Sequence, residues 1–269
     1  MNVNAMFRRF GGKAGTGKLV RLLILGLAAS VVVTCGEESS PTDQDNSRQL
    51  NQRLNTEDIT FFFAEGDSVN ADYQQAFHEW AVPYLGISMP RRLRYFKYFD
   101  NAHMREINGQ PYGSWADVEG YAVHSVESQQ GHEAIHCYSR VIGWPPDFFT
   151  EGIAVALDLN PYTGEEVPFF GAPVHTLRRT WLAEGTLYPL RDMVANDGFW
   201  SGRWTQAYPQ AGSFVQFLIA EFGLEVYKEL FRGIDDFDST ETILNAFQIV
   251  YGMPLDEAES LWHDFLQGS

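Results

Sequence analysis

The segment Gly131-His132-Glu133-Ala134-Ile135-His136, followed by Glu151, is the feature that most constrains how this chain of 269 residues can fold. On a helix, four residues advance the chain by about 400°, so His132 and His136 project from nearly the same face, one turn apart. Two neutral imidazoles in this arrangement suit a zinc ion. Glu133 is offset by about 100°, which places its carboxylate beside the metal, where it can take a proton from a water molecule. The pattern predicts one helix that carries two metal ligands and a general base.

A catalytic zinc site also needs a third protein ligand and one open coordination position. The first helix can end at Gly143, and the prolines that follow can turn the chain into a second helix that starts near Asp147. The apolar residues of this second helix would pack it against the first and bring Glu151 toward the two histidines. Asp147 and Asp158 remain alternative carboxylates, although Asp147 also has the character of a helix N-cap and Asp158 lies near the end of the second helix. We therefore predict a His, His, Glu site for one zinc ion per chain.

The same residues allow two other interpretations. A metzincin arrangement would need glycine and histidine where the chain has Ser139 and Ile142, so that arrangement is excluded. A helix could also carry two histidines and a glutamate on a solvated face with no metal. With 7 histidines in the chain, the five-residue pattern would arise by chance in roughly one chain in a hundred of this composition. The metal site is therefore the favoured interpretation.

The motifs His132-Glu133-x-x-His136 and Glu151-Gly152-x-Ala154 together resemble the gluzincin metallopeptidases, most closely the compact peptidase MA-like domains related to aminopeptidase N. The segment 207–218 is similar to the helix that carries a tyrosine facing the zinc in these enzymes, and the segment 251–262 resembles their closing helices. By this resemblance, Tyr208 would donate a hydrogen bond to the oxyanion that forms during hydrolysis. The alternative for Tyr208 is a half-buried packing residue. Pro209 directly after it predicts that Tyr208 stands at the start of a helix.

The resemblance implies an α+β fold of the thermolysin-like type. A small mixed β-sheet lobe would carry the zinc helices, and a mainly helical C-terminal lobe would follow, with the zinc between the two lobes. It also implies a zinc-dependent metallopeptidase that hydrolyses peptide or protein substrates with Glu133 as general base. The Gly-Ala-Met-Glu-Asn segment of aminopeptidase N relatives is missing, because residues 120–127 have the composition of a strand instead. An aminopeptidase is therefore not implied, and Glu127 is expected to be a solvated residue at the end of that strand.

Two alternatives from other functional classes stay open at this point. One is a noncatalytic envelope lipoprotein that uses the same cleft to bind a partner. The other is a zinc hydrolase that acts on a non-peptide amide or ester, because the motif specifies water activation and attack on a carbonyl but not the substrate.

The amino terminus has the layout of a secretory signal peptide. Five basic residues precede the apolar run 22–33, and no acidic residue occurs before Glu37. The run is short for a membrane span, and it ends at Thr34-Cys35-Gly36, which resembles a bacterial lipoprotein processing site. We predict cleavage before Cys35, acylation of Cys35 and a lipid-anchored protein in the bacterial cell envelope, with an uncleaved membrane anchor as the alternative. Residues 36–56 are polar and predict a flexible tether, which leaves 57–269 for one domain.

The net charge of the chain limits the classes of partner that it can bind. The whole sequence has 19 basic and 35 acidic residues and a net charge of −16. Removal of the five basic residues before Cys35 would leave 14 basic residues and a net charge of −21. Nucleic acids and anionic lipid surfaces would repel such a protein, so a nucleic-acid function is not expected. The acidic surface suits solubility, or a cationic or neutral substrate.

Cys137 would be the sole cysteine of the folded part, so no intrachain disulfide is expected. It follows the presumed ligand His136, but one helical step turns it about 100° away from the metal. We therefore expect a buried apolar residue and no further ligand at this position.

Periodicity and turn residues predict the remaining elements. Strands are expected at 59–64, 92–99 and 120–127, and the second of these should turn one face to water because basic and apolar residues alternate along it. Helices are expected at 70–82, 173–183, 209–222, 224–232, 239–250 and 255–266. Two aromatic pairs, Phe169-Phe170 and Phe199-Trp200, lie near the predicted cleft, where they would line an apolar pocket or form part of the core.

Overall fold

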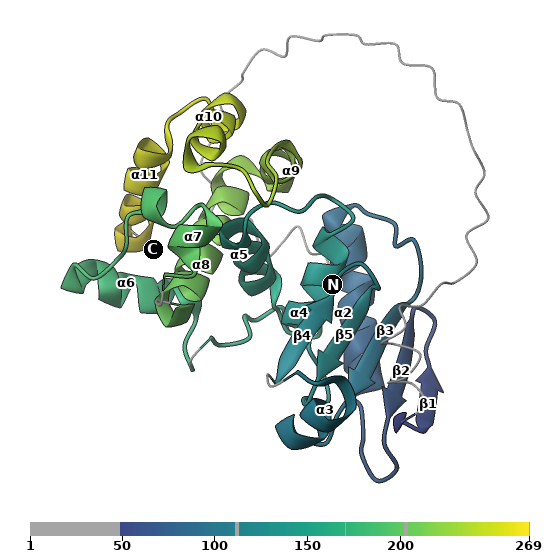
Figure 1. The fold of residues 1–269 in the computed structure, drawn as a ribbon. Coiled ribbons are helices and arrows are strands. Elements are labelled where there is room, and N and C mark those ends of the chain that lie inside the picture. Colours follow the sequence, from purple (N-terminus) through teal and green to yellow (C-terminus); the bar gives the residue numbers. More distant parts are fainter. Residues whose placement is uncertain (1–48, 111–112, 170, 202–203, 269) are drawn as a thin grey trace, which may run out of the picture.

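The structure is a computed structural model, which describes residues 49–110, 113–169, 171–201 and 204–268. A five-stranded sheet lies on one side of the molecule and most of the helices lie on the other (Figure 1). The helices α4 (Gly131–Ser139) and α5 (Asp147–Leu157) lie where the two parts meet. The α+β fold class with a small mixed sheet and a mainly helical C-terminal part is confirmed.

The sheet has the strand order β1-β2-β3-β5-β4. Its central strands β2 (Ile59–Phe63), β3 (Leu93–Lys97) and β5 (Ala122–Ser125) are parallel, and each lies within one of the three segments predicted as strands. The outer strands β1 (Gln52–Asn55) and β4 (Ser114–Asp117) each pair in antiparallel fashion. Both edges of this mixed sheet are therefore formed by strands that were not predicted.

Strand β1 changes the expected boundary of the domain. Residues 52–55 fall in the segment assigned to the polar tether, yet they pair with β2 from Gln52 opposite Phe63 to Asn55 opposite Thr60. Every residue of β1 is exposed. An edge strand of this kind gains its stability from backbone hydrogen bonds, so hydrophobic periodicity could not reveal it. The rest of the tether up to residue 48 and the signal peptide lie outside the described residues.

Strand β3 does not turn one face to water, so that expectation was wrong. Leu93 and Tyr95 are fully buried in the larger core cluster, and Phe96 is fully buried in a smaller cluster on the other face. Lys97 is only 5% exposed. Its buried ammonium group donates hydrogen bonds to Asp67 at 2.9 Å and to a backbone carbonyl oxygen. A buried charge that is paired in this way is tolerated, and the pairing depends on a contact that periodicity does not describe.

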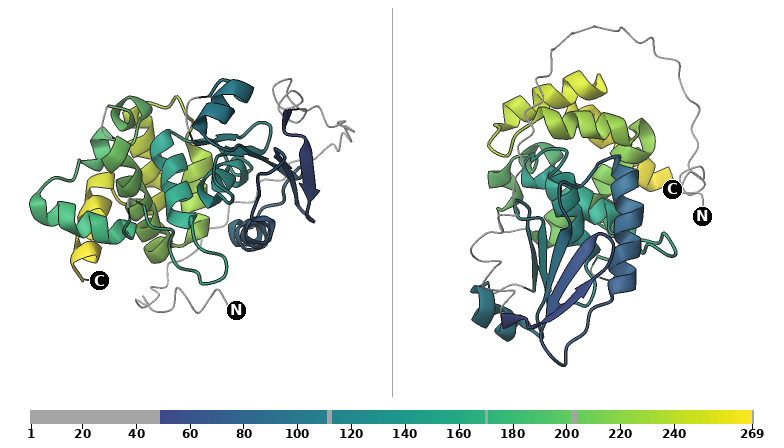
Figure 2. Two further views of the ribbon diagram at one scale, coloured as in Figure 1. Left: turned by 90° about the horizontal axis from the view of Figure 1, so that it is seen from below. Right: turned by 90° about the vertical axis from the view of Figure 1, so that its right-hand side faces the viewer.

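Helices cover both faces of the sheet (Figure 2). Helix α2 (Ala71–Leu85) and helix α4 share the larger core cluster with the sheet, through side chains such as Phe77 and Ile135. Helix α3 (Asn101–Asn108) contributes Met104 to the smaller cluster on the opposite face. Helix α4 ends at Ser139, three residues earlier than predicted. The sheet thus acts as a platform that supports the helix with both histidines.

The C-terminal part is built from helices whose bounds agree with the predictions to within about two residues, with one exception. The agreeing helices are α6 (Val174–Glu184), α9 (Leu224–Gly233), α10 (Thr240–Tyr251) and α11 (Leu255–Gly268). The short elements η3 (Leu190–Asp192) and α7 (Asn196–Phe199) were not predicted. The exception is α8 (Trp204–Phe222), which starts five residues before the predicted start and contains Pro209 in its second turn. Tyr208 therefore does not open a helix as expected, because the first turn of α8 precedes it.

Helices α5 and α8 approach each other closely because each places a glycine against the other. A β-carbon at position 152 would lie 2.6 Å from Val215 Cγ2, and one at position 212 would lie 2.7 Å from Val155 Cβ. Both separations are shorter than van der Waals contact, so a larger residue could enter only if the helices moved apart. This glycine contact fixes the position of α8 relative to the helix that carries Glu151.

Candidate metal centre

Helix α4 presents His132 and His136 on one side, one turn apart. Their rings lie 4.9 Å apart between centroids at an angle of 81°, and their Nε2 atoms are separated by 3.2 Å. Gly131 begins the helix, and its neighbours leave no room for a side chain there, because a β-carbon would collide with the carboxylate of Asp158. Because the helix starts directly before His132, both histidines have helical spacing, as predicted.

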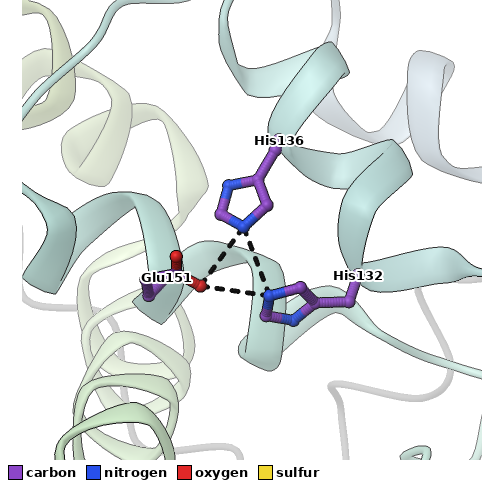
Figure 3. Close-up of side chains that lie close together, drawn as sticks. All are labelled: His132, His136 and Glu151. Atoms are coloured by element: carbon purple, nitrogen blue, oxygen red, sulfur yellow. Dashed lines mark hydrogen bonds and ion pairs between the residues drawn. The ribbon is translucent and has the colours of Figure 1, made fainter. Parts of the chain in front are cut away.

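Glu151 comes to the same place from helix α5. Its Oε2 atom lies 3.0 Å from His132 Nε2 and 3.2 Å from His136 Nε2, so the three side chains converge on one point (Figure 3). Helix α5 starts at Asp147 directly after Pro145 and Pro146, which is where the sequence predicted the turn. The packing of α4 against α5 then brings Glu151 opposite the histidines.

The three donor atoms fit a divalent metal ion. Zinc bonds of about 2.0–2.1 Å in tetrahedral geometry place neighbouring ligand atoms about 3.3 Å apart. The donor atoms of His132, His136 and Glu151 are 3.0–3.2 Å apart, so a small movement outward would meet this requirement. Two imidazole nitrogens and one carboxylate oxygen also form a donor set that zinc prefers. Asp147 and Asp158, the alternative third ligands, do not belong to this group of donors in the described part of the chain.

The electrostatics of the group favour a bound cation. Burial disfavours the charged imidazolium of His132, but the hydrogen bond to Glu151 and the nearby charge of Glu133 outweigh this and raise its pKa to about 9. Burial alone would raise the pKa of Glu151, but the two histidines outweigh it and hold the pKa below its ordinary value. The carboxylate is therefore stabilised by positive charge, which protons supply when no metal is bound. A divalent ion could replace those protons, because metal binding requires neutral imidazoles.

Glu133 lies beside the donor group and outside it, as its helical offset predicts. Burial raises the pKa of its carboxyl group, while the two histidines oppose this shift. A raised pKa makes a carboxylate a stronger base, which is the property that proton abstraction requires. In position and environment, Glu133 can serve as a general base.

Tyr208 reaches the site from helix α8. Its ring stacks on the imidazole of His132, with centroids 6.2 Å apart and 23° between the planes. Burial raises the pKa of Tyr208, and the nearby carboxylate of Glu151 raises it further, so the hydroxyl group stays protonated and can donate a hydrogen bond. Phe169 and Phe199 pack around the same ring. The structure thus brings Tyr208 to the donor group, whichever role it has.

Two cavities meet at the site, and His132 and Glu133 line both of them. The first, about 250 Å³, which we name the β4 cavity, is also lined by Ser114, Trp115, Ala116, Val118, His136, Trp144, Asp147, Thr150, Glu151 and Tyr208. The second, about 310 Å³, which we name the Asp158 cavity, is also lined by Gln130, Val155, Asp158, Val167 and Phe169. The proposed base therefore borders two cavities that differ in their other lining residues.

Several wall residues of these cavities were not predicted as functional. Asp147 was considered as an N-cap, but Pro146 occupies that position, and the Asp147 carboxylate accepts a hydrogen bond from Trp200 Nε1 instead. Of the aromatic residues expected near the cleft, Phe199 is a core residue and Trp200 is 50% exposed, while Phe170 lies outside the described residues. Strand β4 was missed entirely. These wall residues come from segments distant in sequence, and β4 carried no local pattern that pointed to the site.

Cys137 faces the sheet and not the donor group. Its sulfur lies 3.7 Å from the carbonyl oxygen of Ala122, and the residue is fully buried. Burial raises the pKa of its thiol well above the ordinary value. It packs as an apolar residue, as expected. Glu127 is exposed at the end of β5, also as expected.

The features predicted for the amino terminus lie outside the described residues, so cleavage before Cys35 and its acylation stay predictions. Within residues 49–268, as far as they are described, no helix has the length and apolar character needed to cross a membrane. A scan against models of protein families gives no match to the chain, and a comparison with curated proteins gives no significant match. The site itself is therefore the basis on which a function can be proposed.

Proposed function

We propose that this protein is an exported zinc-dependent metallopeptidase. One observation carries the proposal: three donor atoms from His132, His136 and Glu151 lie within 3.2 Å of one another, and Glu133 and Tyr208 line the same cavity. An accidental cluster would supply ligands, but it would not also supply a buried base and a protonated hydroxyl group beside them.

Each of these residues would have a separate role in hydrolysis. His132, His136 and Glu151 would hold the zinc ion, which when bound polarises the scissile carbonyl group and acidifies a water molecule. The Glu133 carboxylate takes a proton from the attacking water and passes it to the leaving amine. The Tyr208 hydroxyl group donates a hydrogen bond to the carbonyl oxygen as negative charge develops on it.

Strand β4 favours a peptide as the substrate. It is the last strand of the sheet and pairs only with β5 among the described strands, while Ser114, Trp115 and Ala116 line the β4 cavity. The free side of an edge strand offers backbone N–H and C=O groups that an extended peptide can bind as an added strand. A small amide or ester would not use such a surface.

The proposed location follows from the amino-terminal sequence alone. The basic and apolar segments before Cys35 support export, and Cys35 supports a lipid anchor in the bacterial cell envelope. Membrane association would thus come through the lipid. The acidic character of the chain, with a net charge of −16, argues against nucleic acid as a partner.

The test compares the zinc-loaded full-length protein with its Glu133→Gln variant. Both proteins are analysed for bound zinc and for hydrolysis of a mixed peptide library and of a panel of small amides and esters. We expect one zinc ion per chain in both, and peptide cleavage in the parent that falls by at least about 10²-fold in the variant, because general base catalysis is lost. Glu229→Gln changes an exposed glutamate on α9 and serves as the control.

Other results would change the proposal in defined ways. Cleavage only of small amides or esters would indicate a zinc hydrolase of another class. Bound zinc without any hydrolysis would favour a noncatalytic lipoprotein that binds a partner in the cleft. A chain that binds no zinc would remove the basis of the proposal.

A further inference from the structure

The β4 cavity contains a carboxylate that hydrolysis does not require. Asp147 is the first residue of α5, one helical turn before Glu151, and it lines the cavity wall. Trp200 Nε1 donates a hydrogen bond to the Oδ2 atom of Asp147. The backbone N–H of Asp147 donates a second one to Asn196 Oδ1 at 2.7 Å. The side chain is therefore held in place, and its Oδ1 atom has no hydrogen-bond partner among the described residues.

Carboxylates outnumber the positive groups around Asp147: Glu151 and Asp236 act on it, and His136 opposes them. The cavity wall includes the carboxylates of Glu133, Glu151 and Asp147, and no lysine or arginine is among its lining residues. No ion pair joins Asp147 to a cation in the described part of the chain. If Glu151 binds the metal and Glu133 acts as base, Asp147 is the carboxylate of this wall that has no cation of its own. Burial disfavours its charged form, so a positive partner would stabilise it.

Aromatic rings also line the cavity beside Asp147. Trp144 and Trp115 line the same cavity, and the face of an indole ring attracts cations. Trp144 already binds one, because the Arg140 guanidinium lies 5.7 Å from its ring centroid. Arg140 does not neutralise Asp147, since it forms an ion pair of 2.6 Å with Glu119. A second cation approaching from the cavity would meet both an aromatic wall and a fixed carboxylate.

We propose that Asp147 and Trp144 form a subsite for a positively charged nitrogen atom of the substrate. This inference rests on the proposed function, and it gives the peptidase a preference for peptides with a cationic group next to the cleaved bond. The group would be the side chain of a lysine or arginine residue or a free amino terminus, which present the same chemistry to the carboxylate. The negative charge of the whole chain would also raise the local concentration of such substrates.

The test uses matched sets of alanine-based peptides. In one set a single lysine occupies each position in turn, and in the other norleucine replaces lysine, which keeps the apolar part of the side chain and removes the charge. Each peptide is made with a free and with an acetylated amino terminus. Binding to the zinc-loaded Glu133→Gln protein is measured by calorimetry, and hydrolysis is measured with the parent.

We expect at least one cationic peptide to bind at least about tenfold more tightly than its neutral match, as a charge-assisted hydrogen bond predicts. A difference between lysine and norleucine would identify a side-chain subsite, and a difference between free and acetylated ends would identify a subsite for the amino terminus. Adding Asp147→Asn should remove the difference. An asparagine at position 147 can still accept the hydrogen bond from Trp200, and its backbone N–H can still donate to Asn196. Thermal unfolding would verify that the variant is folded.

Asp72→Asn is the matched control, because Asp72 is exposed on α2 and does not line either cavity. It should leave the tenfold difference in place. Equal affinities within all matched pairs, including no measurable binding, would overturn the subsite, as would a preference that survives Asp147→Asn. Selective binding by Glu133→Gln without hydrolysis by the parent would retain the subsite and refute the peptidase, so the two proposals fail separately.

Discussion

The ring of Tyr208 stacks on the imidazole of His132, although the two residues come from different helices in different parts of the molecule. The stack places a phenol hydroxyl group beside the proposed metal ligands, in surroundings that keep it protonated. It also explains how one residue can combine packing with chemistry. The ring takes part in the aromatic cluster around Phe169 and Phe199. The hydroxyl group forms a hydrogen bond with Glu151, and a substrate carbonyl oxygen would have to take its place as acceptor.

Replacement of Tyr208 by phenylalanine separates these two contributions. Phenylalanine keeps the stack and removes the hydrogen-bond donor, so we expect kcat to fall by about 10²–10³-fold while the zinc content stays the same. Steady-state kinetics and metal analysis measure both quantities. Tyr162→Phe, at a tyrosine that is 55% exposed, is the control. An unchanged kcat would assign Tyr208 to packing alone.

Replacement of Glu151 by glutamine should weaken zinc binding by more than about tenfold, because the site loses the negative charge that balances the metal. Competition with a chelating dye measures the affinity, and Glu229→Gln on the surface of α9 is the control. In the parent, chelation should abolish hydrolysis and added zinc should restore it. Equal zinc affinity in Glu151→Gln and parent would exclude Glu151 as a ligand.

Replacement of Gly212 by alanine should lower the free energy of unfolding by about 1–3 kcal/mol, because the added carbon collides with Val155 and pushes α5 and α8 apart. Gly233→Ala is the control, since a β-carbon there meets no atom within 4 Å. Thermal unfolding of the metal-free proteins compares the two. The close helix contact would be refuted if both variants were as stable as the parent.

The stability of the fold should depend on pH through His124. This side chain is fully buried between the rings of Trp115 and Phe96, and burial lowers its pKa to about 3. The unfolded chain, with an ordinary histidine pKa of about 6.5, binds a proton more readily, so stability is full above pH 6.5 and declines as the pH falls toward 3. At pH 5 the loss from this group alone is about 2 kcal/mol.

Urea unfolding at several pH values tests this dependence. His124→Gln should be less stable overall, but its free energy of unfolding should change less between pH 6.5 and pH 4 than that of the parent. Identical slopes in the parent and His124→Gln would contradict the lowered pKa.

The sequence was informative where the structure depends on local spacing. Helix periodicity predicted that His132 and His136 share a face, and the prolines before Asp147 predicted the turn that returns Glu151 to them. The C-terminal helices were found for the same reason, because each buries one apolar stripe.

Features that depend on distant partners were missed. Strand β1 is fully exposed and β4 lies at the opposite edge, so neither shows an apolar pattern. Lys97 looked solvated because its partner Asp67 lies in another segment. The role of Asp147 depends on Trp200 and on a cavity wall supplied by β4, which no local pattern encodes. Pro209 suggested a helix start, but α8 tolerates it in the second turn.

The glycine contact between α5 and α8 bears on the order in which the site forms during synthesis. All three proposed ligands lie between His132 and Glu151, so they leave the ribosome together, well before Gly212 does. Until α8 is complete, α5 lacks the surface against which it packs, and Glu151 is not yet held opposite the histidines. High affinity for the metal is therefore expected to appear late in folding. If the chain is exported before it folds, it would acquire this affinity only after it has crossed the membrane.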